Sequence, residues 1–155
     1  MRVGFTFNKK NLISRFITKE TNSSWSHCFL ILQDIGDDSL IAEASFGGVE
    51  FSLLSKYGNK DKYNLEIIDL GDVMTKESNN EMLSLIGKPY GYLELLGNLV
   101  ARIFHMQNNP ITDAVVCSEY VDQVLRVSKL SDKFQDTDPN LITPGDIYKI
   151  LKKED

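Results

Sequence analysis

The sequence predicts an α+β domain, because strand patterns fill its first half and helical patterns dominate its second half. Apolar runs separated by turn residues such as Gly47-Gly48 indicate hairpins in the first half. After residue 72 the apolar residues recur every three or four positions instead, which is typical of amphipathic helices. We therefore expect a central, mainly antiparallel sheet with helices packed against it. The strands are expected at residues 2–7, 25–32, 40–45, 49–53 and 64–70.

In the first half, the first strand places its apolar residues on one face, as a half-buried strand does. Asn8 is a suitable cap for a helix over residues 9–19, where apolar residues recur at helical spacing. The segment 25–32 is almost continuously apolar and predicts a central buried strand. A turn containing Gly36 then leads into the hairpin of the third and fourth strands.

In the second half, a helix is expected over residues 72–86, with the Ser78-Asn79-Asn80 triplet as a candidate break. A strong helical stripe of apolar residues follows over residues 93–104. The next helix is expected to begin at Cys117, since the residues after it place their apolar side chains on one helical face. The closing helix, residues 144–152, has a threonine cap followed by proline, which is a common helix start.

Composition sets broad limits on function. A chain of 155 residues is expected to form one domain over residues 1–155. A formal net charge of −5 argues against nonspecific nucleic-acid binding. No apolar stretch reaches the roughly 18 residues of a spanning helix, and the N-terminal apolar run is too short for a signal peptide. With two cysteines and no disulfide framework, a cytoplasmic location is the simplest expectation, unless another factor exports the protein.

Cys117 is the first candidate for a functional residue. At the first turn of a helix, free backbone N–H groups and the helix dipole favour a thiolate and can hold an oxyanion. The residue could therefore act as a nucleophile. Buried free cysteines also serve as small apolar side chains, so the local sequence leaves both interpretations open.

A nucleophilic cysteine needs a base and a group that orients the base. The chain has two histidines, His27 and His105. His105 ends the stripe over residues 93–104, where interaction with a helix C-terminus explains it. His27 opens an apolar strand, where a buried imidazole must find a partner. Glu43 lies among apolar neighbours on the strand expected to pair with it, and is the candidate orienting group, although an edge-strand glutamate facing water remains the alternative.

Taken together, these segments resemble a known enzyme family. The carrying motifs are Trp25-Ser26-His27 before an apolar strand, Glu43-Ala44 on the following strand, and Cys117-Ser118-Glu119-Tyr120-Val121 at a helix start. Gly87 to Tyr92 and the Thr143-Pro144 helix start also match. The chain is thus similar to the permuted NlpC-type, papain-like cysteine hydrolases, most of all the YiiX-like amidases, and more distantly to lecithin:retinol acyltransferase. In that group the histidine strand precedes the cysteine helix, as it does here.

The resemblance implies a permuted papain-like fold, with Cys117 as nucleophile, His27 as base and Glu43 as the third polar member. Tyr90 and Trp25 are the candidate substrate-binding residues, with a core or turn tyrosine as an equal alternative for Tyr90. The implied activity is that of a thiol protease or amidase, cleaving a peptide or isopeptide bond through a Cys117 thioester. Peptides, peptidoglycan fragments and acyl groups are the candidate substrates. A lipid or ester acyl hydrolase or acyltransferase is the alternative within this mechanism, and a non-catalytic binding module is the alternative from another class.

Other residues have simpler expected roles. Cys28 is expected to point to the opposite strand face from His27 and to pack in the core. Glu119 is expected to act as a cap or ion-pair partner. The histidines and cysteines do not have the spacing of a zinc site, and no phosphate-binding glycine loop is present in the sequence. We therefore expect neither a metal nor a cofactor, and the sequence does not predict the oligomeric state.

Overall fold

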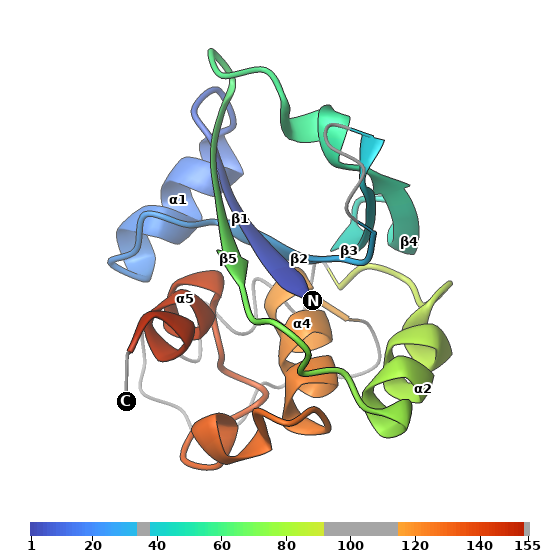
Figure 1. Ribbon diagram of the computed structural model, residues 1–155. Helices are drawn as coiled ribbons and strands as arrows, with labels where there is room; N and C mark the ends of the chain where they lie inside the picture. Colours follow the sequence, from blue (N-terminus) through green and yellow to red (C-terminus); the bar gives the residue numbers. More distant parts are fainter. Residues whose placement is uncertain (34–37, 92–114, 154–155) are drawn as a thin grey trace.

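The computed structural model describes residues 1–33, 38–91 and 115–153 of the chain (Figure 1). Its centre is a five-stranded sheet in the order β4-β3-β2-β1-β5, and every neighbouring pair of strands in it is antiparallel. The predicted α+β class with an antiparallel sheet is therefore confirmed. The strands are β1 (Arg2–Asn8), β2 (His27–Ile31), β3 (Leu40–Ser45), β4 (Gly48–Leu53) and β5 (Tyr63–Asp69).

Four α-helices lie in the described residues: α1 (Leu12–Glu20), α2 (Lys76–Leu85), α4 (Cys117–Arg126) and α5 (Pro144–Lys152). Figure 1 shows α2, α4 and α5 on one side of the sheet, while α1 lies near the far end of β1. The α5 start is the predicted one. Thr143 accepts the backbone N–H of Asp146 and Pro144 is the first helical residue.

Two helix starts differ from the prediction. Helix α1 begins at Leu12, because the side chain of Asn11 accepts the N–H groups of Ile13 and Ser14. Asn8 ends β1 instead of capping the helix. Helix α2 begins four residues later than predicted and runs through the Ser78-Asn79-Asn80 triplet. Ser78 does not break this helix, since its hydroxyl accepts the backbone N–H of Thr75 and closes the N-terminal turn.

The two faces of the sheet bury different sets of side chains. On the helix side, residues from β1, β2 and β3 pack against α4 and α5 in the main core, as Cys28 and Leu30 do. On the other side, Phe29 and Ile31 of β2 belong to a smaller cluster with Leu54 and Tyr57. The single-turn helix η2 (Leu54–Tyr57) follows β4 and closes that second cluster. Consecutive residues of β2 therefore face two different environments, which decides where His27 and Cys28 point.

Some expectations lie outside the described residues: the Gly36 turn, the stripe over residues 93–104, and His105. Within the described ranges, none of the helices has the length and apolar character needed to cross a bilayer.

Candidate catalytic site

Cys117 is the first residue of α4, as predicted. The Oε2 atom of Glu119 accepts the backbone N–H of Val116 at 3.2 Å, and this hydrogen bond caps the helix as expected for Glu119. Cys117 is only 3% exposed, and α4 packs directly against β2 and β3. The sulfur therefore lies where the positive end of the helix dipole meets the two strands that carry His27 and Glu43.

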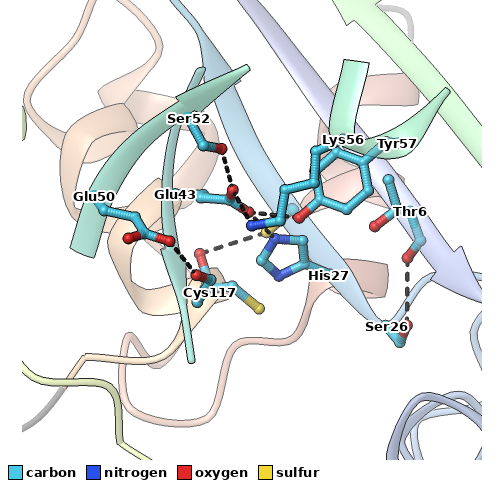
Figure 2. Close-up of polar contacts among 11 residues, drawn as sticks. Thr6, Ser26, His27, Glu43, Glu50, Ser52, Lys56, Tyr57 and Cys117 are labelled. Carbon is cyan, nitrogen blue, oxygen red and sulfur yellow. Dashed lines mark hydrogen bonds and ion pairs between the residues drawn. The ribbon is translucent and has the colours of Figure 1, made fainter. Parts of the chain in front are cut away.

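His27 is the first residue of β2, and its side chain is 19% exposed. The Nε2 atom of its ring lies 2.9 Å from Oε2 of Glu43. Because a carboxylate only accepts, Nε2 carries the hydrogen and Nδ1 remains for the thiol. The ring centroid lies 5.9 Å from those of both Phe29 and Tyr57, and these contacts limit the rotation of the imidazole. Figure 2 shows the ring between Glu43 and the side chain of Cys117.

Glu43 is completely buried on β3, on the same face of the sheet as His27. Besides His27, three donors hold its carboxylate (Figure 2). Tyr57 donates its hydroxyl to Oε2 at 2.5 Å, Ser52 donates its hydroxyl to Oε1 at 2.5 Å, and Lys56 donates its ammonium to Oε1 at 2.8 Å. Two cations and two hydroxyls thus compensate for the loss of water around a buried carboxylate. The alternative of a glutamate facing water is ruled out by this burial.

The pKa values of the site follow from these contacts. Burial would lower the pKa of His27, but the charge of Cys117 and a hydrogen bond to it, and then Glu43, outweigh burial and raise that pKa to about 9. Burial would raise the pKa of Glu43, but His27, Lys56 and Ser52 together hold it below its ordinary range. The pKa of Cys117 lies well below that of a free thiol. A hydrogen bond from Cys28 is the largest cause; burial opposes it, and the charge of His27 and a hydrogen bond to it lower the pKa further.

Cys28 has a place in the site that the sequence did not predict. It faces the helix-side core and is completely buried, as expected for a strand neighbour of His27. However, its Sγ lies 3.5 Å from the carbonyl oxygen of Cys117, and the two thiols interact. Burial, followed by this interaction, raises the pKa of Cys28 well above its usual value. These opposite directions favour the proton on Cys28 and the negative charge on Cys117, next to the helix N-terminus and the imidazole.

Replacing Cys28 tests this hydrogen bond. Cys28→Val nearly conserves volume, so we expect a loss of less than about 1.5 kcal/mol in unfolding free energy. The variant lacks the S–H donor, so the pKa of Cys117 should rise and its alkylation near neutral pH should slow several-fold. Cys28→Ser keeps a donor and is the matched control. Equal pH profiles of alkylation for wild type and Cys28→Val would show that Cys28 only fills space.

A cavity of about 380 Å³ opens beside the histidine. His27 and Tyr90 both line it, and Tyr90 stacks on Phe46 with ring centroids 6.3 Å apart. Cys117 is not among its lining residues, but Lys56 and Tyr57, which donate to Glu43, line it together with His27. Other described residues that line it include Thr6, Ile13, Ser26, Glu50 and Tyr63.

Trp25 has different surroundings. It is 9% exposed, packs against the rings of Phe5 and Tyr148, and is not among the residues that line the cavity. The structure thus gives Tyr90 a place at the cavity and gives Trp25 a place in the core.

Sequence reasoning missed three of the four donors to Glu43: Ser52, Lys56 and Tyr57. Lys56 and Tyr57 lie on η2, which the sequence presents as the edge of a charged loop. Only the fold of that single turn back toward β3 brings them to the carboxylate. The contact with Ser52 was predictable from strand pairing, because β4 pairs with β3 and Ser52 lies diagonally across from Glu43 on the same face of the sheet.

A comparison with protein-family models finds no match, and neither does a comparison with curated protein sequences.

Proposed function

We propose that the protein is a thiol hydrolase with Cys117 as nucleophile, His27 as base and Glu43 as the group that orients and charges the base. The observation that carries this proposal is the chain of contacts from the α4 N-terminus through the imidazole to a buried carboxylate with four donors. A depressed thiol pKa beside a raised imidazole pKa is the state of a thiolate–imidazolium pair. A binding module would need none of these three residues.

The proposed chemistry is acyl transfer in two stages. The Cys117 thiolate attacks a carbonyl carbon, and the oxyanion that forms is stabilised by the free N–H groups at the start of α4. The protonated His27 gives its proton to the leaving amine, so the C–N bond breaks and a thioester remains. His27 then removes a proton from water, which attacks the thioester and releases the acid and the thiol.

The proposed fold family is the permuted papain-like group of NlpC type, with YiiX-like amidases as the nearest pattern. Two features support it: the histidine strand precedes the cysteine helix in the chain, and the helix packs on the strands that carry His27 and Glu43. By this likeness the bond cleaved is an amide, in a peptide, an isopeptide or a peptidoglycan fragment.

An ester or lipid acyl group is the second candidate substrate. The observation that favours it is the apolar and aromatic part of the cavity wall, which includes Ile13, Ile17, Phe46, Tyr57 and Tyr63. Such a wall suits an acyl chain as well as an apolar peptide side chain. Parallel assays with fluorogenic peptide amides and p-nitrophenyl acyl esters separate the two candidates.

Alkylation by iodoacetamide tests the thiolate directly. A free thiol with a pKa of about 8.5 has only a small thiolate fraction at pH 6, roughly 0.3%. We expect the alkylation of Cys117 at pH 6 to retain a large part of its rate at pH 8, because the imidazolium of His27 preserves the thiolate. Mass spectrometry of the labelled peptides distinguishes Cys117 from Cys28.

The matched control is His27→Ala, which removes the cation and should move the alkylation profile toward that of a free thiol. The shape of each profile is compared within one variant, so the burial of Cys117 does not bias the result. A wild-type profile with a midpoint near 8.5 would contradict the proposed function.

A further inference from the structure

Helix α1 presents an apolar face that nothing in the described part of the chain covers. Leu12, Ile13 and Phe16 are 77%, 46% and 45% exposed, although their spacing places them together on one side of the helix. Only Ile17 is buried among the residues of α1. Large exposed apolar side chains grouped on one short helix are unusual for a soluble surface and commonly mark an interaction site. We refer to Leu12, Ile13 and Phe16 as the α1 face.

Basic residues precede this face and alternate with it along the chain. Lys9, Lys10, Arg15 and Lys19 are all exposed, and residues 9–20 contain a single acidic residue, Glu20. We refer to these four cations as the basic rim. Two more lysines lie beside it, because Lys9 donates its ammonium to the carbonyl of Lys60 and its backbone N–H to that of Lys62. This concentration of positive charge stands out in a chain whose formal net charge is −5.

We propose that the α1 face and its basic rim dock the protein on an anionic lipid surface. An amphipathic helix with bulky apolar residues on one face and lysine or arginine beside them is the pattern of helices that lie in a membrane interface. The apolar residues enter the acyl boundary, while the cations remain at the level of the anionic headgroups. A purely polar anionic partner would use the basic rim but would leave the apolar side chains exposed to water.

The position of the α1 face relative to the cavity gives the docking a consequence. Ile13 belongs to both, since it is half exposed and also lines the cavity with Ser14 and Ile17 of the same helix. Docking through α1 therefore brings the rim of the cavity to the lipid headgroups. The docking itself goes beyond the proposed hydrolysis and does not depend on it, because Cys117, His27 and Glu43 belong neither to the α1 face nor to the basic rim.

Vesicle flotation tests the docking. The full chain is mixed with vesicles of phosphatidylcholine alone or of phosphatidylcholine with phosphatidylglycerol. We expect it to float with the anionic vesicles only, and to be released by high salt, which screens the basic rim. Cys117→Ala should float like wild type, so a failure of the proposed hydrolysis would leave this result unchanged.

Two pairs of variants separate the apolar and the charged contributions. Leu12→Ser should lower the partition of the protein from solution onto anionic vesicles by about 10-fold, because one bulky apolar side chain no longer enters the acyl boundary. Its control is Leu83→Ser, since Leu83 is 55% exposed on α2, well away from α1 in Figure 1.

The double variant Lys10→Glu with Arg15→Glu should lower the fraction of protein bound to anionic vesicles by about 10-fold or more. Its control is Lys76→Glu with Lys88→Glu, which changes the net charge equally at exposed positions elsewhere.

Equal thermal midpoints confirm that these surface variants fold. The proposal is overturned if wild type does not float with anionic vesicles, or if Leu12→Ser floats as well as wild type. It is also overturned if wild type floats equally with neutral vesicles, since the basic rim would then have no role. A dimer that Leu12→Ser dissociates, in a protein that ignores vesicles, would assign the α1 face to a second copy of the chain.

Discussion

Cys117→Ala is expected to reduce turnover to the uncatalysed background while leaving the fold intact. Alanine removes the sulfur atom that forms the thioester, and α4 contains no second cysteine that could replace it. In a serine protease the loss of the nucleophile costs about six orders of magnitude in turnover. Hydrolysis of the amide or ester substrate that wild type cleaves is the measurement, with thermal unfolding as the test of folding.

The matched control for this variant is Cys28→Ser, which changes the other cysteine and keeps a donor beside the nucleophile. It should retain most of the activity, whereas Cys117→Ala should retain none. Turnover that persists in Cys117→Ala but disappears in Cys28→Ser would place the nucleophile on β2. Turnover that persists in both would mean that the hydrolysis does not use a thiol.

The sequence predicted the members of the site better than their environment. The structure brings Cys117, His27 and Glu43 together, and each of them lies on the kind of element that local patterns predict for it. Cys117 starts a helix, His27 starts a strand, and Glu43 lies on the neighbouring strand. Alternation along β2 also predicted that Cys28 would face the core. Their catalytic roles remain a proposal.

The contacts that depend on tertiary structure were beyond the reach of sequence patterns. The hydrogen bond between Cys28 and Cys117 forms only because α4 packs on the helix-side face of β2. The exposure of Leu12 and Phe16 was missed for the opposite reason. Helical spacing normally indicates a buried face, but α1 lies at a margin of the sheet where only Ile17 is covered.

The donors around Glu43 determine how strongly this carboxylate stabilises the charged form of His27. A buried carboxylate beside the imidazole favours the imidazolium, and two hydroxyls keep it ionised. Lys56, which is 40% exposed, also pairs with this carboxylate through the other oxygen. The carboxylate therefore stabilises the imidazolium of His27 less than an isolated carboxylate would, and its hydrogen bond to Nε2 also fixes the orientation of the ring.

Glu43→Gln is expected to lower turnover by roughly one to three orders of magnitude. In a serine protease the corresponding change of acid to amide costs about four orders, but a thiolate depends less on its base. The amide has one accepting oxygen for four donors, so some of them lose their partner and the fold also loses stability. The measurements are turnover and the thermal midpoint of each variant.

The pH profile decides whether this loss comes from the charge of Glu43. In wild type the ion pair extends from the depressed pKa of Cys117 up to the pKa of His27, at about 9. Removing the carboxylate disfavours the imidazolium and therefore the thiolate beside it, so the midpoint of the alkylation profile should move to higher pH. The alkaline limit of turnover, which follows the pKa of His27, should move to lower pH. Glu66→Gln, on β5, is the matched control, because it alters a strand glutamate that contacts Tyr148 and Lys152 instead of the site. If Glu43→Gln and Glu66→Gln both keep the wild-type profile and turnover, Glu43 stabilises the fold without assisting His27.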